Sequence, residues 1–270
     1  MTSLPTGRAA ITGASSGIGA VYAERLANRG HDLLLIARRA DRLETLAAAL
    51  RKAHRVNVET LLADLEDPAA LAVVESRVGQ PDISILVNNA GAGGLGPTAN
   101  VTADQIERTI RLNVVALSRL SHAALAKFRA DGRGLLVNIG SVIAHAPSPS
   151  GAVYSGSKAY VLNFTRSLQA EYKAQPGVRI QLVMPGPIRT EFFSSQGLSD
   201  SVFPDSSYLT ADQLVDAAIA GAEADELVTV PSMADPATWD RLEETRLAFL
   251  SAVHAGAVAP RYLEQEAVTA

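Results

Sequence analysis

The chain has 270 residues, 47% of them hydrophobic, and a formal net charge of −4. This length and apolar content suffice for a full core and lie near the upper limit for one domain, so we expect a single domain over residues 1–270. The absence of cysteine excludes disulfides, thiolate metal ligands and cysteine nucleophiles. Lys and Arg form no long cluster, so we expect neither nucleic acid nor a membrane surface as a partner.

Membrane insertion and export are also not expected. The N-terminal sequence MTSLPTGRAA has no apolar core followed by a cleavage pattern, and the longest strictly aliphatic run, LLLI, is too short to span a bilayer. We therefore expect a cytoplasmic protein. The five histidines show no ligand spacing with carboxylates, so we expect no metal site.

Short apolar segments recur along the chain, with helix-length segments between most of them. Segments that are apolar on both faces and separated by helices are typical of a parallel sheet covered on each side. We therefore expect an α/β fold, a doubly wound, Rossmann-like parallel sheet of about seven strands with helices on both faces. The expected strands are 8–12, 32–37, 58–63, 83–87, 134–139, 178–184 and 226–230.

Two segments carry the residue stripe of an amphipathic helix, at alternating steps of three and four. The first stripe is Ile106, Ile110, Asn113, Leu117, Leu120, Ala124 and Phe128, and the second is Tyr154, Lys158, Val161, Thr165, Leu168 and Tyr172. Both stripes include polar residues on the face that should pack inward.

Two later segments depart from the alternation of strands and helices. Ser, Gly and Pro punctuate residues 186–210, which we expect to form a substrate loop or lid, or simply a long connection. Residues 236–270 contain another helical pattern, TWDRLEETRLAFLSAVHA, and form a C-terminal helical extension whose role the sequence leaves open.

The unusual motifs follow the predicted strands, at the sheet edge where open α/β proteins bind ligands. In TGASSGIG, the glycines Gly13, Gly17 and Gly19 allow a tight turn, close approach of a pyrophosphate and a helix start that faces an anion. By itself such a turn could be only a turn, but its position after the first strand favours a dinucleotide site.

The second strand ends in IARR, which bears on the choice of cofactor. NAD enzymes usually place Asp or Glu here to bind the ribose 2′-hydroxyl, whereas a 2′-phosphate calls for Arg. Ala37 stands where the acid would be and Arg38 follows, so NADP(H) is favoured over NAD(H). Asp41 is the competing acid, but we interpret it as a helix cap. The alternative for Arg38 and Arg39 is a solvated charge pair.

On these residues the chain resembles a compact, single-domain, NADP-preferring short-chain dehydrogenase/reductase over Arg8 to about Thr190. Ser141 and Tyr154 are 154 − 141 = 13 positions apart, as the pattern of that family requires. The matching motifs, in order, are TGASSGIG, Asp64, NNAG at 88–91, Asn113, Ser141, YSGSK and PGPIRT.

The resemblance implies four catalytic residues. Tyr154 would be the general acid and base, and Ser141 would orient the carbonyl or hydroxyl group. Lys158 would hold the nicotinamide ribose and lower the pKa of the tyrosine, and Asn113 would anchor a water in a proton relay. Asn113 could equally be a buried structural amide, and Ser141 a helix cap or turn residue.

The resemblance also implies a set of residues that border the cofactor, some through side chains and some through the backbone. These are Gly13, Ser15, Ser16, Gly17, Ile18, Gly19, Arg38, Arg39, Asp64, Leu65, Asn89, Ala90, Gly91, Tyr154, Lys158, Ile188 and Thr190.

The spacing of Tyr154 and Lys158 has a physical reading of its own. A phenol with a pKa of about 10 is a poor base at neutral pH. A cation about 4 Å away contributes roughly 4 kcal/mol at an effective dielectric near 20, or about three pKa units. Lys158, four residues on, lies on the same helical face and can supply that cation. The alternative is an ordinary Tyr and Lys pair with the lysine reaching to water.

We therefore expect an NADP(H)-dependent oxidoreductase that moves hydride between nicotinamide and a ketone, aldehyde or secondary alcohol. The alternatives are a catalytically silent dinucleotide-binding regulator or scaffold, and an epimerase or dehydratase of the longer relatives. The resemblance implies a homodimer or homotetramer formed through 103–130 and 152–175. An apolar substrate pocket is expected from Leu95, Ile143, Phe192, Phe193, Phe203 and Tyr208.

Overall fold

The computed structural model describes residues 2–196, 199, 202–254 and 256–263. Its contacts divide the chain into two units, Met1–Ser232 and Met233–Ala270. The prediction of one domain over 1–270 therefore remains a prediction. Parts of the expected loop (197–198 and 200–201) and of the C-terminal extension (255 and 264–270) lie outside the described residues.

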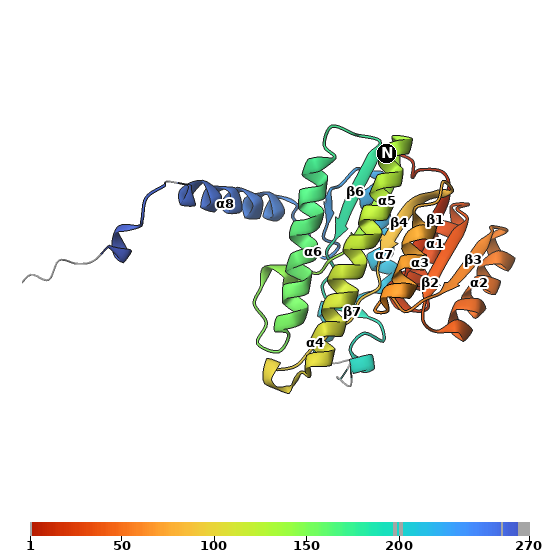
Figure 1. Ribbon diagram of the computed structural model, residues 1–270, viewed down its shortest axis with the longest axis horizontal. Helices are drawn as coiled ribbons and strands as arrows, with labels where there is room; N and C mark the ends of the chain where they lie inside the picture. Colours follow the sequence, from red (N-terminus) through yellow and green to blue (C-terminus); the bar gives the residue numbers. More distant parts are fainter. Residues whose placement is uncertain (1, 197–198, 200–201, 255, 264–270) are drawn as a thin grey trace, which may run out of the picture. The chain divides into compact units, whose positions relative to one another are not determined.

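The first unit is built on a seven-stranded sheet in which every pair of neighbouring strands is parallel (Figure 1). The strand order is β3-β2-β1-β4-β5-β6-β9. This confirms the predicted doubly wound, Rossmann-like sheet. The strands are β1 (Arg8–Thr12), β2 (Leu33–Ala37), β3 (Val58–Leu62), β4 (Ile83–Asn88), β5 (Gly134–Ile139), β6 (Val178–Val183) and β9 (Val228–Thr229).

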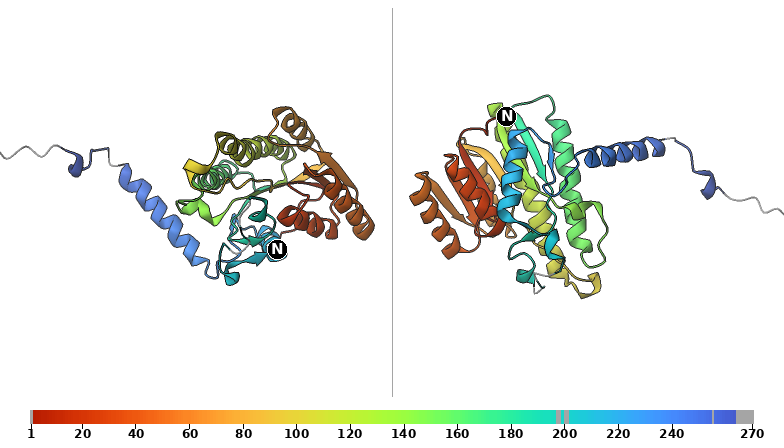
Figure 2. Two further views of the ribbon diagram at one scale, coloured as in Figure 1. Left: turned by 90° about the horizontal axis from the view of Figure 1, so that it is seen from below. Right: turned by 180° about the vertical axis from the view of Figure 1, so that it is seen from behind.

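Helices cover both faces of the sheet (Figure 2). Each face has its own hydrophobic core. The helices α1 (Gly17–Asn28), α2 (Ala40–His54) and α7 (Ala211–Glu223) pack on one face. The helices α3 (Pro68–Val78), α5 (Leu117–Asp131) and α6 (Ala152–Glu171) pack on the other. Strand order reverses between β1 and β4, so the carboxyl ends of these two strands border the crevice where such sheets bind ligands.

The first predicted amphipathic stripe does not follow one regular helix. It runs through α4 (Ala103–Ile110), a π-helical segment (Arg111–Ala116) and then α5. The wider π turn shifts the phase of the buried face, so Ile110 is exposed while Thr109 is buried. The expectation that Ile110 packs inward was therefore wrong, whereas Asn113 is buried as its place in the stripe predicted.

The segment 186–210 is anchored at both ends by a strand pair that the sequence did not predict. β7 (Ile188–Arg189) pairs in parallel with β8 (Leu209–Thr210). Thr210, the last residue of β8, is also the N-cap of α7, where it forms a capping box with Gln213. The remaining short helices of the first unit are Thr98–Asn100, Val142–His145, Ser194–Gln196 and Asp205–Ser207.

The second unit contains α8 (Ala237–Val253) and the short helix Pro260–Tyr262. None of the described residues of α8 is buried. The helical pattern predicted in the C-terminal extension is confirmed for this stretch.

Candidate active site

Three of the four candidate catalytic residues lie at or beyond the carboxyl end of β5. Ser141 lies two residues beyond the end of β5, and α6 carries Tyr154 and Lys158. The Lys158 ammonium donates to the backbone oxygen of Ile139, the last residue of β5, at 2.9 Å. The second predicted stripe therefore packs inward as expected, with Lys158 only 7% exposed.

Tyr154 is half-buried, with its ring against the loop 186–210. The ring centroids of Tyr154 and Phe192 are 5.5 Å apart. Burial raises the pKa of Tyr154 to about 12, although a hydrogen bond with Ser141 acts in the opposite direction. The tyrosine is therefore a protonated phenol at neutral pH.

Lys158 sits close to Tyr154 but does not produce the lowered tyrosine pKa that we expected. Its ammonium lies 5.8 Å from the centroid of the Tyr154 ring. Burial lowers the pKa of Lys158 itself to about 8, because its charged form is costly in this environment. Desolvation of both groups thus outweighs their mutual effect, and the pKa of Tyr154 moves upward rather than downward.

Asn113 is 1% exposed and its amide joins three elements. Its Oδ1 accepts a hydrogen bond from the backbone N–H of Ala92, and its Nδ2 donates to the backbone oxygen of Ala92, each at 2.8 Å. Nδ2 also donates to the Ser157 hydroxyl on α6 at 3.0 Å. Asn113 is therefore a buried structural amide, the alternative given above, and its hydrogen bonds link the loop after β4 to α6.

Gly91 brings Asn113 and Lys158 to one place. A Cβ atom on Gly91 would lie 3.3 Å from Asn113 Oδ1 and 3.9 Å from Lys158 Nζ. The loop after β4, the π-helical segment and α6 therefore meet at this glycine.

Ser141 caps the short helix Val142–His145. Its hydroxyl accepts from the backbone N–H of Ile143 at 3.3 Å and donates to the backbone oxygen of Pro185 at 3.4 Å. The capping role that the sequence left open is thus real, and it fixes the hydroxyl beside the Tyr154 phenol.

The glycine-rich turn after β1 is packed against the loop after β4. A Cβ atom on Gly19 would lie 2.4 Å from the Gly13 backbone oxygen and 2.6 Å from Asn89 Nδ2. The Asn89 amide donates to the backbone oxygen of Thr12 at 2.9 Å, and the Thr12 hydroxyl accepts from the backbone N–H groups of Asn89 and Ala90 at 3.0 Å each. Glycine is thus required here for close backbone packing.

The glycine-rich turn leads into α1, whose N-terminus has no side-chain cap. Ser16 is the N-cap of α1, yet its hydroxyl makes no capping hydrogen bond. Gly17 has a φ of +53°, and a Cβ atom there would lie 3.1 Å from the methyl group of Thr190. The uncapped N-terminus of α1 and the predicted cofactor residue Thr190 therefore face each other.

The two arginines after β2 point to different partners. Arg39 donates to the hydroxyls of Ser15 at 3.1 and 3.2 Å and of Ser16 at 2.5 Å. Arg38 pairs with Glu66 at 3.1 Å and lies 3.6 Å from Asp64. The structure thus joins the arginines both to the glycine turn and to the end of β3.

Asp41 is not the N-cap of α2 as we expected. Arg39 occupies the N-cap position, and Asp41 lies in the first turn of the helix. A carboxylate there still faces the positive end of the helix dipole. Three apolar residues among the predicted cofactor positions, Ile18, Leu65 and Ile188, are buried or half-buried near the same edge.

Aromatic rings predicted for a substrate pocket form a connected cluster in the loop 186–210. Phe193 packs edge to face on Phe192, Phe203 and Tyr208, with ring centroids 5.3, 6.0 and 6.4 Å apart. Arg189 lies 4.7 Å from the centroid of the Tyr208 ring. Through Phe192, this cluster continues to the ring of Tyr154.

Gln196 fastens the same loop to the loop after β4. Its amide donates to the backbone oxygen of Phe192 at 2.7 Å and accepts from the backbone N–H of Leu95 at 3.4 Å. A Cβ atom on Gly93 would lie 1.9 Å from the Gln196 amide oxygen, so only glycine leaves room for this contact. Leu95, predicted to line the pocket, is thereby brought to the aromatic cluster.

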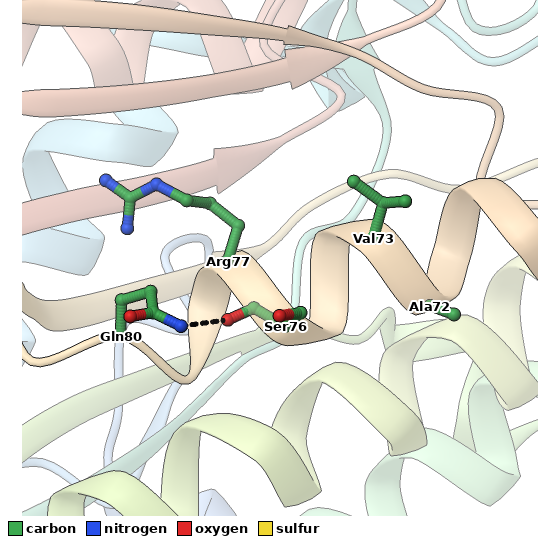
Figure 3. Close-up of a pocket in the computed structure, with 5 residues that line it drawn as sticks. All are labelled: Ala72, Val73, Ser76, Arg77 and Gln80. Atoms are coloured by element: carbon green, nitrogen blue, oxygen red, sulfur yellow. Dashed lines mark hydrogen bonds between the residues drawn. The ribbon is translucent and has the colours of Figure 1, made fainter.

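A shallow depression on α3 is a different feature. Ala72, Val73, Ser76, Arg77 and Gln80 line it (Figure 3). Its one charged side chain, Arg77, is already paired with Glu59 and Asp82. None of the candidate catalytic or cofactor residues lines this depression, so the candidate site remains the carboxyl edge of the sheet.

Four residues at the site escaped the sequence reasoning. Thr12 and Ser157 stand inside the motifs TGASSGIG and YSGSK, and their small polar side chains were the available signal. Glu191 follows Thr190 directly but contacts arginines about 150 positions away. Gln196 carried no sequence signal, because its partners come from the distant loop after β4.

Metal ligation and membrane spanning are two further features that bear on function. Residues 2–196, 199, 202–254 and 256–263 contain no group of three or more His, Asp or Glu side chains placed to hold a metal ion. No helix among them is both long and apolar enough to cross a membrane.

Comparison with known sequences shows which family the chain resembles. A family model described as short chain dehydrogenase matches residues 8–200. Serine 3-dehydrogenase of Agrobacterium fabrum is 34% identical over 216 residues, which cover 77% of this chain and 85% of that protein. Very-long-chain 3-oxoacyl-CoA reductase-A of Danio rerio is 33% identical over 187 residues, 68% of this chain, and the match spans only 58% of that relative.

Solved structures agree with the sequence matches. A short-chain dehydrogenase from Sphingobium yanoikuyae in complex with NADPH is 44% identical, with a TM-score of 0.91 over 95% of this chain and 100% of that one. A bulky-bulky ketone specific alcohol dehydrogenase from Comamonas testosteroni is 38% identical, with a TM-score of 0.87 over 96% and 99% of the two chains. The chain belongs to the short-chain dehydrogenase family.

Proposed function

We propose that this chain is an NADP(H)-dependent oxidoreductase that interconverts a ketone or aldehyde and the corresponding alcohol. The observation that carries the proposal is the meeting of Ser141, Tyr154 and Lys158 at one sheet edge, beside the glycine turn after β1. A silent dinucleotide-binding protein would have no need of this set.

The residues of the crevice fit a phosphorylated dinucleotide. Gly13 and Gly19 allow the close backbone packing of the turn, and the uncapped start of α1 would offer N–H groups to a pyrophosphate. Arg38 and Arg39 stand where a 2′-phosphate would be bound, and β2 ends in Ala37 rather than an acid. The NADPH bound by the Sphingobium relative supports the same choice. When bound, the nicotinamide supplies or accepts the hydride of the reaction.

In the proposed mechanism the side chains of this protein transfer the proton. Tyr154 donates its phenolic proton to the substrate oxygen during reduction and takes it back during oxidation. Ser141, held by Ile143 and Pro185, donates a hydrogen bond to the same oxygen and orients it. Lys158, fixed by Ile139, would hold the nicotinamide ribose, and after reduction it would return a proton to Tyr154.

Asn113 supports this proton path indirectly. Its amide holds Ala92 and Ser157, and the Ser157 hydroxyl in turn donates to the backbone oxygen of Tyr154 at 2.7 Å. In the proposal, Asn113 also positions a water that connects Lys158 to solvent. The π-helical turn around Asn113 supports this role, because such turns are frequent at functional sites.

The substrate is proposed to carry an apolar part. The aromatic cluster of Phe192, Phe193, Phe203 and Tyr208 would form its wall, together with Leu95 and Ile143. The similarity to the Comamonas alcohol dehydrogenase, which is specific for bulky-bulky ketones, supports such a substrate class. In the same proposal the protein works in the cytoplasm as a homodimer or homotetramer.

The test uses purified protein, NADPH and a panel of ketones with large groups on both sides of the carbonyl. We expect consumption of NADPH by the wild type and a loss of at least about 100-fold in kcat for Tyr154→Phe, because the acid is removed. NADPH binding should be retained in the variant. Near-native turnover by Tyr154→Phe would overturn the assignment, and binding without turnover across the panel would favour the silent alternative.

A further inference from the structure

Glu191, in the loop 186–210, is held by two arginines at the start of α2, the N-cap Arg39 and Arg42. Its carboxylate accepts from Arg39 Nη1 at 2.9 Å and from Arg42 Nη1 at 2.7 and 2.8 Å. Its chain neighbours are Thr190, which faces Gly17, and Phe192, which packs on Tyr154. The ion pairs therefore tie the loop beside the catalytic tyrosine to the helix that follows β2.

The carboxylate shares a guanidinium with the glycine turn. Arg39 donates to Glu191 through Nη1 and to the hydroxyls of Ser15 and Ser16 through Nε and Nη2. The two arginines hold the pKa of Glu191 below its usual range, so its side chain is an anion at neutral pH. The guanidinium that contacts the glycine turn is thus already paired with a carboxylate.

A 2′-phosphate bound near Arg39 would need the guanidinium N–H donors that the Glu191 carboxylate already occupies. Carboxylates and phosphates both bind guanidinium groups through paired N–H donors. A 2′-phosphate is bound by arginine at the end of the second strand of such folds, and here Arg39 is the N-cap of α2, two residues after the end of β2. A phosphate near Arg39 would also face the negative charge of Glu191, which disfavours it further.

Building on the proposed function, we propose that Glu191 is a cofactor-selectivity residue that occupies Arg39 and Arg42 in place of a 2′-phosphate and thereby weakens binding of NADP(H) relative to NAD(H). A ligand with a 2′-phosphate has to displace the carboxylate or tolerate its charge. A ligand without that phosphate leaves both ion pairs intact. The residue next to Glu191 contacts Tyr154, so the same exchange links cofactor choice to the loop beside the catalytic site.

The experiment compares Glu191→Gln with wild type in fluorescence titrations with NADPH and with NADH at low ionic strength. We expect the Kd for NADPH to fall by about 3- to 10-fold and the Kd for NADH to change by less than about 2-fold. The gain for NADPH should shrink in about 0.5 M salt, because the competing charges are exposed and screened.

Glu44→Gln is the matched control. Glu44 is an exposed carboxylate that pairs with Arg51 on the same helix α2, at 2.8 Å. Its removal changes the net charge by the same amount as removal of Glu191 but leaves Arg39 and Arg42 untouched. We expect the Kd values of this variant for both cofactors to match those of the wild type.

The outcomes separate the inference from the function on which it rests. An unchanged or raised Kd for NADPH in Glu191→Gln would overturn the inference, as would an equal gain for NADPH and NADH. Either of these results would leave the proposed function standing if the wild type binds NADPH and reduces ketones. A wild-type protein that binds neither cofactor would refute the proposed function, and the inference with it.

Discussion

The two sides of the candidate site are held together in different ways. On the cofactor side, the glycine turn is fixed by backbone crowding, since a Cβ atom on Gly19 would lie 2.4 Å from the Gly13 oxygen. On the substrate side, the loop 186–210 is fixed by side chains, such as the Gln196 amide and the rings around Phe193. Backbone crowding can be recognised in the sequence because it requires glycine. Side-chain contacts between distant residues have no local sequence pattern.

Gly19→Ala is the largest perturbation expected on the cofactor side. The added methyl group would collide with the Gly13 oxygen and the Asn89 amide, which cannot move without opening the turn. We expect the Kd for NADPH to rise by at least about 100-fold, because the pyrophosphate cradle is lost. Fluorescence titration measures this change.

Gly156→Ala provides the control for that substitution. A Cβ atom on Gly156, in α6, would meet nothing within 4 Å. We expect unchanged cofactor binding and a helix stabilised by about 0.5–1 kcal/mol. Similar losses of binding in Gly19→Ala and Gly156→Ala would contradict the distinction between crowded and open glycines.

Lys158 tests the electrostatics of the catalytic helix. Its folded-state pKa of about 8 lies below its ordinary value of 10.5, so between these values the unfolded state binds more protons. The free energy of unfolding of the wild type should therefore rise, relative to Lys158→Met, by at most about 3 kcal/mol from pH 8 to pH 10.5. Denaturant titrations across this range measure the difference.

The exposed Lys52, on α2, supplies the matched variant Lys52→Met. This variant removes an exposed lysine, whereas Lys158→Met removes one that is only 7% exposed, so the comparison isolates the effect of burial. A flat pH profile for the difference between wild type and Lys158→Met would mean that Lys158 is hydrated rather than buried.

Arg38→Ala addresses the cofactor side with a smaller expected effect. Arg38 faces Asp64 and Glu66 at the end of β3, and a 2′-phosphate would add a stronger partner. We expect the Kd for NADPH to rise about 10-fold while the Kd for NADH is unchanged. Arg111→Ala, which removes an exposed arginine of the π-helical segment, should change neither value. Equal changes for the two cofactors in Arg38→Ala would mean that this arginine is only a solvated charge.

Phe193→Ala and Tyr208→Ala probe the substrate side, where the smallest effects are expected. Phe193→Ala leaves Phe203 packed on Tyr208, and Tyr208→Ala leaves Phe193 packed on Phe203. We expect the preference for bulky over small ketones, as the ratio of kcat/KM values, to fall about 3- to 10-fold. Val73→Ala, on the exposed face of α3 in Figure 3, should leave the ratio unchanged. An unchanged ratio in both aromatic variants would remove the loop from the substrate pocket.

Much of the sheet and its motifs could be predicted from the sequence because the signals are local. All seven predicted strands are present, although the last shrinks from five residues to Val228–Thr229. Ser141, Tyr154 and Lys158 meet as their spacing and their strand ends predict. The error at Ile110 arose because a π turn looks like regular helix in a hydrophobic pattern.

The rest depends on contacts between distant parts of the chain. The pKa of Tyr154 was expected to fall on account of Lys158, but the depth of burial, which spacing cannot show, raises it. The partners of Glu191 and Gln196 lie about 150 and 100 positions away in sequence. No local sequence pattern predicts such pairs. They are nevertheless the contacts that hold the loop 186–210 in place.

The most direct test of the central claim follows the hydride itself. Wild-type protein is incubated with a bulky ketone and NADPH deuterated at nicotinamide C4, on either face, and the product alcohol is analysed by mass spectrometry. The account predicts one deuterium on the carbinol carbon from one of the two labelled cofactors, and almost none when Tyr154→Phe replaces the wild type. Alcohol formed without deuterium from either cofactor, or no alcohol from any ketone of the panel, would contradict it.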